Sequence, residues 1–332
     1  MVSSIDPLAL SRDGIEAAAR RLAPHVIKTP VVEVEGAAFG LPGATLVFKL
    51  ELLQVTNAFK FRGAVNHMLA MAEAGEHGGV VTVSSGNHGI SLAEAGRRFG
   101  VRVVVMMGPK ANPWRRERIQ ALGAEVRIIE DLNLAFEVAE HLAVEDRLRF
   151  VHPYDGVQTL EGTASLGLEF GRQAGRLDAV VLPIGGGGLA AGMGFGMRAL
   201  QPDLTVFGVE PTGAPTMSGA RAAGAPVALT HIETVADSLG APKAAPLSFA
   251  LCQEHIAEVL LLDDAETEAA MREIYSVLRQ AIEPSAAIGA AAVLGPLRER
   301  LAGQRIGLIL CGANQEPTRQ FSMLTGRNLI PA

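Results

Sequence analysis

The stretch AVVLPIGGGGLAAGMGFGMRAL, residues 179–200, reads as a short buried strand, four successive glycines and the start of a helix. Glycines allow backbone N–H groups to crowd around an anion, and the dipole of the following helix favours negative charge at that point. A tight turn is the alternative, but a turn needs one or two glycines rather than four. The stretch therefore predicts a phosphate site, although it has neither the GK[ST] of a Walker loop nor GxGxxG spacing.

Strand-like and helix-like runs alternate along the chain from about residue 45 onward. The buried runs include ATLVFKL, VRVVVMM, DAVVLPI and RIGLILCG, with Ala- and Glu-rich helical patterns between them. This rhythm predicts a doubly wound, mainly parallel α/β fold, in which ligands bind beyond the carboxyl ends of the strands. No Pro/Ser/Gly-rich tether separates two halves. We therefore expect two interleaved domains, a large one from 1–77 and 149–332 and a small one from 78–148.

The composition argues against several classes of partner. Lys and Arg number 29 against 35 Asp and Glu, and the one basic run, RRER at 115–118, is typical of a solvated helix face, so nucleic acid is not expected. The uncharged stretch between Asp178 and Arg198 contains Pro183 and the four glycines, which argues against a membrane span. The start of the chain has no signal-peptide pattern, and the two cysteines have no metal-ligand spacing, so we expect a reducing cytoplasm.

A second strand-to-helix junction is SSGNHG, residues 84–89. Ser84, Ser85 and Asn87 supply hydroxyl, amide and free backbone N–H groups, which suit a second small anion such as a carboxylate. An ordinary N-cap explains one of these residues but not the cluster. His88 alone is equally compatible with a structural histidine.

A lysine and a cysteine complete the candidate site. Asn57 is expected to be an N-cap, which places Lys60 in the first turn of a helix. Partial desolvation beside the positive helix end should lower the pKa of Lys60 and provide a neutral amine as a nucleophile. Cys311, in LILCGAN, follows the last buried run; a buried cysteine usually packs in a core, but here it could also contact a ligand.

Together these motifs resemble fold-type II pyridoxal-phosphate enzymes, specifically the serine/threonine dehydratase and serine racemase branch. The resemblance runs from HVIKTP at 25–30 to CGAN at 311–314 and includes FKFRGA, SSGNHG, HPYDG, GGGGL, VEP, ETVADSLG and EPSAA. It implies a tryptophan synthase β-like fold, pyridoxal 5′-phosphate as the cofactor and a homodimer or homotetramer. Cysteine synthases share the fold but carry a different asparagine loop and a threonine-rich phosphate loop, so they fit less well.

The resemblance implies a set of cofactor contacts. Lys60 is similar to the lysine that forms the Schiff base and then removes the Cα proton, and Phe59 to the residue that packs beside the cofactor ring. Asn87 is similar to the asparagine that hydrogen-bonds the pyridoxal 3′ oxygen. Gly185, Gly186, Gly187, Gly188 and Leu189 are similar to the phosphate loop.

The resemblance also implies contacts to the substrate. Ser84, Ser85, Asn87 and His88 are similar to the loop that binds the substrate carboxylate, and Ser85 could serve as the opposite-face acid that a racemase requires. Cys311 stands where the family has Ser or Cys facing the pyridine nitrogen. A thiol cannot hold that nitrogen protonated as a carboxylate would, so the ring is a weaker electron sink and elimination is favoured over transamination.

Two departures from the family pattern bear on metals and substrates. Glu210 is present in VEPTGAPT, but Thr216 stands where the metal site of the family has a second acidic residue, so no metal ligand is assigned and weak dependence on divalent cations is expected. Residues 133–136, NLAF, contain no arginine for a second substrate carboxylate, which argues against 3-hydroxyaspartate.

The sequence therefore predicts a pyridoxal-phosphate-dependent ammonia-lyase that converts a β-hydroxy amino acid, L-threonine or L-serine first, to a 2-oxo acid and ammonia. Phenylserine dehydratase, hydroxyectoine-utilisation dehydratase and amino-acid racemase remain alternatives within the family. A non-catalytic binder of a phosphorylated metabolite is the alternative from another class. Lys60 argues against it, since a pure binding protein does not need a Schiff-base lysine.

Overall fold

The computed structural model describes residues 10–130 and 134–327. Its larger sheet has six strands in the order β1-β2-β10-β7-β8-β9. The first pair, β1 and β2, is antiparallel, and the other neighbouring strands are parallel. The strands are β1 (Val31–Glu35), β2 (Thr45–Lys49), β10 (Arg305–Ile309), β7 (Ala179–Pro183), β8 (Thr205–Pro211) and β9 (Glu258–Leu262).

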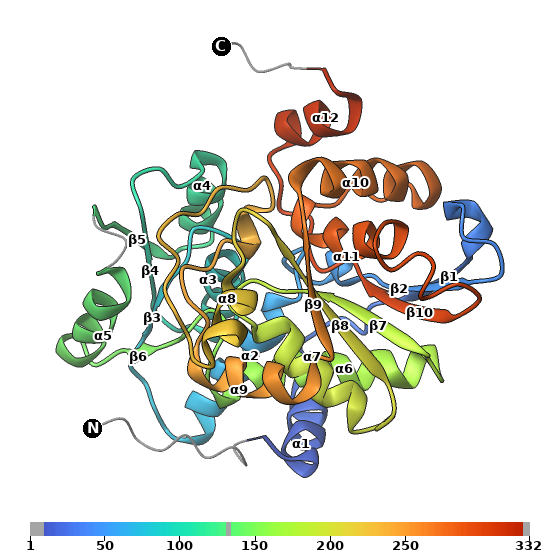
Figure 1. The fold of residues 1–332 in the computed structure, drawn as a ribbon. Coiled ribbons are helices and arrows are strands. Elements are labelled where there is room, and N and C mark those ends of the chain that lie inside the picture. The colour runs from blue at the N-terminus through green and yellow to red at the C-terminus, as the bar shows by residue number, and fades with distance from the viewer. Residues whose placement is uncertain (1–9, 131–133, 328–332) are drawn as a thin grey trace.

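Helices surround the sheets of the molecule (Figure 1). They are α1 (Arg12–Leu22), α2 (Lys60–Glu73), α3 (Asn87–Phe99), α4 (Pro113–Ala121), α5 (Ala135–Glu145), α6 (Val157–Ala174), α7 (Gly188–Arg198), α8 (Thr216–Ala223), α9 (Pro246–His255), α10 (Asp264–Leu278), α11 (Pro284–Leu294) and α12 (Pro317–Thr325), with short 3-10 segments η1 (Gly36–Phe39), η2 (Glu51–Leu53) and η3 (Asp237–Leu239). In Figure 1, α10 and α11 cover one face of the six-stranded sheet, and α6 and α7 cover the other. Among the described helices, none combines the length and the apolar character needed to cross a bilayer.

The second sheet has four parallel strands in the order β5-β4-β3-β6. They are β5 (Glu125–Ile128), β4 (Val103–Met107), β3 (Val80–Val83) and β6 (Arg149–Phe150). Val80 and Val105 belong to an apolar cluster with residues of α3 and α4, whereas Val81 and Val104 belong to another with residues of α5. Because helices cover both faces of mainly parallel sheets, the predicted doubly wound α/β fold is confirmed. The predicted domain boundaries stay a prediction, and β6 lies just beyond residue 148.

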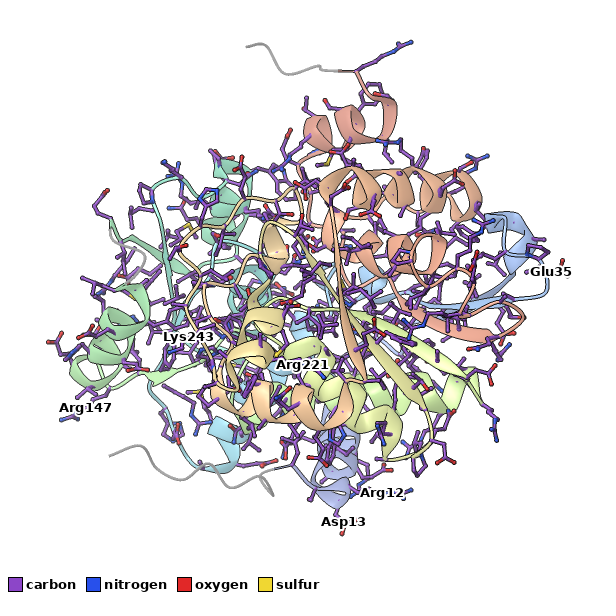
Figure 2. The ribbon with its side chains drawn as sticks, viewed as in Figure 1. Arg12, Asp13, Glu35, Arg147, Arg221 and Lys243 are labelled. Atoms are coloured by element: carbon purple, nitrogen blue, oxygen red, sulfur yellow. The ribbon has the colours of Figure 1, made fainter. Side chains whose placement is uncertain are left out.

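Charged side chains are distributed around the outside of the molecule. Figure 2 shows Asp13, Glu35 and Arg147 pointing outward from its periphery. A different group of charges is buried beside the start of α2, where the chain leaves the larger sheet.

This buried group consists of Lys49, Glu51, Arg62 and Glu169. The Arg62 guanidinium donates to the two Glu51 carboxylate oxygens at 2.9 and 2.7 Å and to Glu169 at 3.1 and 3.0 Å. Lys49 Nζ donates to Glu169 at 2.5 Å and to Thr29 O at 2.7 Å. Since Lys49, Glu51 and Arg62 are all buried, two positive and two negative charges compensate one another away from water.

We predict that Arg62→Met lowers the free energy of unfolding by about 3–5 kcal/mol, because it leaves Glu51 and Glu169 with one cation between them in a buried site. Arg97→Met is the matched control. Arg97 is 56% exposed and pairs with Glu94 on its own helix, so its replacement should change stability by no more than about 0.5 kcal/mol. Urea unfolding followed by circular dichroism measures both changes. Similar values for the two variants would contradict a structural role for the buried group.

Candidate active site

One cavity of about 660 Å³ lies where the carboxyl ends of β3, β7 and β10 meet. The predicted site residues all line it, although they come from four separate segments: Phe59, Lys60, Ser84, Ser85, Asn87, His88, Gly185, Gly186, Gly187, Gly188, Leu189 and Cys311. The roles assigned to these residues stay predictions. Within each sheet, the parallel strands place their strand-to-helix junctions at one edge, and the cavity is lined by such junctions of both sheets.

Lys60 is the first residue of α2, as predicted, but Asn57 is not its N-cap. The φ of Asn57 is +56°, in the left-handed region, and its side-chain amide donates to Leu52 O instead. Lys60 Nζ donates to Pro153 O at 2.5 Å and lies 5.0 Å from the centroid of the Phe59 ring. Burial lowers the pKa of Lys60 to about 8, against the opposing influence of Cys311 and Glu283. An appreciable share of the amine is therefore neutral near neutral pH.

The four successive glycines at 185–188, the glycine loop, pack closely against the rest of the cavity wall. A Cβ atom at Gly186 would lie 2.2 Å from the Tyr154 ring, and one at Gly188 would lie 2.7 Å from Tyr154 O. Gly187 has a φ of +102°, which side chains rarely allow. Within the described chain, the N–H groups of Gly185, Gly186 and Gly187 donate to no protein acceptor. Free N–H groups before the start of α7 favour an anion at this place.

The loop at 84–89 combines a cap with free donors. Ser84 Oγ accepts from Gly86 N at 3.3 Å and from Gly89 N at 3.1 Å, whereas the N-cap of α3 is Gly86, so none of the three predicted residues is the N-cap. In the part of the chain that the structure covers, the N–H groups of Ser85, Asn87 and His88 have no acceptor. These three donors line the cavity and suit a carboxylate.

Two side chains of this cavity wall are held neutral by burial. The pKa of the His88 ring lies well below its usual range, first because the ring is buried and second because Lys60 is nearby. His88 Nε2 has no hydrogen-bond partner among the described residues. Burial raises the pKa of the Cys311 thiol well above its usual range, and Glu283 acts in the same direction. Cys311 therefore presents an uncharged sulfur to the cavity, and this sulfur lies 3.9 Å from the carbonyl oxygen of Ser285, to which it donates.

A buried amide–carboxylate chain, which the sequence did not predict, holds Asn87. Asn87 Nδ2 donates to Glu283 Oε1 at 2.7 Å, and Asn87 Oδ1 accepts from Asn314 Nδ2 at 2.7 Å. Asn314 N also donates to Glu283 Oε2 at 3.1 Å. The motifs EPSAA and CGAN contain Glu283 and Asn314, but only their meeting in space shows that they fix the orientation of Asn87.

A second arrangement that the sequence did not predict joins the two sheets at the cavity. Arg115, on α4, pairs with Asp237 at 2.8 and 3.2 Å and donates to Asn314 O at 3.0 Å. Arg115 is buried, and each nitrogen of its guanidinium donates to one of these partners. Although it lines the cavity, Arg115 is already neutralised and is poorly suited to binding a second anion.

Glu210 is occupied by backbone and hydroxyl donors. Its carboxylate accepts from Met217 N at 2.6 Å, and from Ser218 N and Ser218 Oγ at 2.8 Å each. Thr216 Oγ1 donates to Ala241 O at 2.7 Å. Across the described residues, no group of three or more His, Cys, Asp or Glu side chains could hold a metal ion. The weak metal dependence expected from Thr216 stays a prediction.

Comparison with known proteins identifies relatives of the whole chain. Residues 22–312 match the family described as "Pyridoxal-phosphate dependent enzyme". The phenylserine dehydratase of Ralstonia pickettii is 40% identical over 296 residues, which are 89% of this chain and 90% of that protein. The structure of maize serine racemase has a TM-score of 0.88 at 30% identity and covers 96% of this chain and 98% of its own. The threonine deaminase of T.th. has a TM-score of 0.85 at 32% identity, covering 92% of this chain and 99% of its own.

The cavity fits pyridoxal phosphate, the cofactor that the family match implies. The free N–H groups of the glycine loop suit its phosphate, and the partly neutral Lys60 amine suits its carbonyl carbon. The Asn87 amide is held in one orientation, and the Cys311 thiol is uncharged, as a neutral ring nitrogen requires. The predicted family resemblance and the predicted cofactor are thereby confirmed.

We predict that Gly186→Ala weakens pyridoxal phosphate binding by about tenfold or more, equivalent to about 1.4 kcal/mol. The new Cβ would meet the Tyr154 ring at 2.2 Å, so the loop or the ring must move. Gly219→Ala is the control, because its Cβ would meet only Val227 at 3.7 Å. Equilibrium dialysis of the apoprotein with pyridoxal phosphate measures both affinities, and an equal effect of the two substitutions would contradict the loop assignment.

Proposed function

This chain belongs to the family of pyridoxal-phosphate dependent enzymes, and we propose that it is an ammonia-lyase that dehydrates a β-hydroxy amino acid with an uncharged β-substituent. The observation that carries the proposal is the position of Lys60. Its partly neutral amine lies in one cavity with two separate sets of free N–H groups, one suited to a phosphate and one to a carboxylate. The names of the relatives support the same reaction class, since one is a phenylserine dehydratase and another a threonine deaminase.

The residues divide the work of binding. The glycine loop would hold the phosphate of the cofactor and Asn87 its ring oxygen. Lys60 would hold its carbonyl carbon until the amine of the substrate takes that place and frees Lys60 Nζ. The N–H groups of Ser85, Asn87 and His88 hold the substrate carboxylate. When bound, pyridoxal phosphate withdraws electrons from the substrate Cα and makes its proton labile.

Lys60 then transfers the protons of the reaction. Lys60 Nζ takes the Cα proton, and the ammonium group thus formed can protonate the departing β-hydroxyl, which leaves as water. The uncharged Cys311 thiol would leave a ring nitrogen beside it unprotonated, a condition that would favour loss of the β-substituent over transamination. Hydrolysis of the remaining enamine gives a 2-oxo acid and ammonia.

Racemisation is the second candidate, and one observation favours it. Ser85 lies on the cavity wall with its side chain exposed, and within the described residues its hydroxyl has no hydrogen-bond partner. A hydroxyl there is free to exchange a proton with the substrate. If Ser85→Ala abolished the formation of D-amino acid and left 2-oxo acid release intact, both activities would reside in the chain.

The cysteines bear on where the protein is located. Cys252 and Cys311 are both buried and free, in keeping with a cytoplasmic protein. The cytoplasmic location and the homodimer or homotetramer stay predictions, which cell fractionation and light scattering would test.

We predict that Lys60→Ala abolishes the absorbance of the bound cofactor at the edge of the visible range and lowers 2-oxo acid release by orders of magnitude, because both depend on the amine. Lys28→Ala, which removes an exposed lysine outside the cavity, should preserve both properties. Spectra and coupled assays of the purified variants measure the effects. Retention of a borohydride-reducible cofactor bond in Lys60→Ala would show that the site assignment is wrong.

We also predict that kcat/KM for threonine exceeds that for 3-hydroxyaspartate by about a hundredfold or more, since an anionic β-substituent would be desolvated while the buried Arg115 is already paired with Asp237 and Lys110 is exposed to solvent. Of residues 133–136, Phe136 faces the cavity, Leu134 is exposed, Ala135 is buried in the core, and Asn133 lies outside the described residues. Steady-state kinetics on the two substrates decide the matter. A preference for 3-hydroxyaspartate would overturn the pocket interpretation and leave the cofactor assignment intact.

A further inference from the structure

Resting on the proposed function, we infer that the β-substituent of the preferred substrate is an aryl ring, recognised by an aromatic wall made of Phe136, His152 and Tyr154. The ring centroids of Phe136 and His152 are 5.2 Å apart, and those of His152 and Tyr154 are 4.6 Å apart with an interplanar angle of 89°. Phe150 supports the wall edge-on from Phe136 at 6.3 Å and from His152 at 6.0 Å. These separations are those of attractive aromatic pairs.

The wall borders the reacting end of the cavity. Phe136, Pro153 and Tyr154 line the same cavity as Lys60. Pro153, between the two aromatic residues of the HPYDG motif, accepts the hydrogen bond from Lys60 Nζ. The wall therefore lies beside the Lys60 amine, next to the place where the reacting carbons of a substrate must be held.

The wall is held in place and carries no charge. Tyr154 is fixed at both ends, because its hydroxyl donates to Lys243 O at 2.9 Å and its ring packs against Gly186. Lys243 is labelled in Figure 2. Tyr154 N donates to His152 Nδ1 at 3.3 Å, so that nitrogen carries no proton. Burial and the Lys60 charge lower the pKa of His152 to about 3, so its ring is neutral at physiological pH.

Core packing is the competing explanation for this cluster, and exposure argues against it. Phe48, Phe61 and Phe170 are fully buried, as core aromatics should be. Phe136, His152 and Tyr154 are only partly buried, and Phe136 and Tyr154 line the cavity, whereas Phe150 packs against the apolar cluster beneath them. A planar ring placed in the cavity would add a further aromatic contact to these pairs, whereas a methyl group would leave the aromatic side chains uncovered.

The charged side chains of the cavity do not offer a competing specificity. Lys110 and Glu130 line the cavity with opposite charges, and both are exposed to solvent. Arg115 is held by Asp237. The partly open, uncharged surface next to Lys60 thus favours an apolar, planar substituent.

Amino acids without a β-hydroxyl test this wall apart from turnover. We predict that titration of the holoenzyme with L-phenylalanine, followed by the change in cofactor absorbance, gives a Kd at least about tenfold lower than titration with L-2-aminobutyrate. L-cyclohexylalanine, which has a similar apolar size but no aromatic ring, should bind more weakly than L-phenylalanine. Both results are expected because an aryl ring gains aromatic contacts in addition to its buried area.

Substitution of Phe136 localises the effect. Phe136→Leu should reduce the preference for L-phenylalanine over L-2-aminobutyrate by about fivefold or more and leave the Kd of L-2-aminobutyrate within about twofold. Phe321→Leu, an equal change at an exposed site on α12, should leave both values unchanged. If Phe136→Leu does not fold, Phe136→Met, which keeps more of the side-chain volume, replaces it.

The outcomes separate this inference from the proposed function. Equal Kd values for the two ligands, or a Phe136→Leu variant that weakens both equally, would overturn the aromatic wall. If threonine releases 2-oxo acid and threo-3-phenylserine is not favoured in kcat/KM, the wall fails while the function stands. If no β-hydroxy amino acid releases 2-oxo acid but the binding preference persists, the function fails while the wall stands.

Discussion

The buried pairing of Arg62 with Glu51 and Glu169 is the interaction on which the site depends. Arg62 lies two residues after Lys60 on the first turn of α2, and it ties that turn to the end of the larger sheet through Glu51 and to α6 through Glu169. A charged group withdrawn from water is held in one place by its partners. The same contacts therefore set where Lys60 begins its helix, and with it the position of the amine relative to the glycine loop.

Much of the site could be predicted from the sequence because its parts are local motifs. A strand followed by SSGNHG or by four glycines determines its own backbone, and parallel strands bring such junctions to one edge. The N-cap prediction for Asn57 was wrong because its backbone adopts the left-handed region. An asparagine can adopt this conformation, but the residue type alone does not predict it. Long-range partners such as Glu283 for Asn87 could not be predicted, since nothing in the local sequence specifies which distant side chain will meet the amide.

Two kinds of group line the cavity. The first part consists of free N–H groups and the partly neutral Lys60 amine, which are suited to phosphate, carboxylate and carbonyl groups. The second part lies beside that amine, where burial keeps His152 and Cys311 uncharged and aromatic rings border the space. The motifs SSGNHG and GGGG allowed the first part to be predicted from the sequence. The second part depends on the packing of α5, a helix on the four-stranded sheet, beside the HPYDG segment.

We propose that Lys60 carries the cofactor. Borohydride reduction of the holoprotein, followed by protease digestion and mass spectrometry of the peptides, tests this attachment. We predict one phosphopyridoxyl group per chain, attached to Lys60 in the FKFRGA segment. A label on another lysine, such as Lys110 at the rim of the cavity, or the absence of any label, would contradict it.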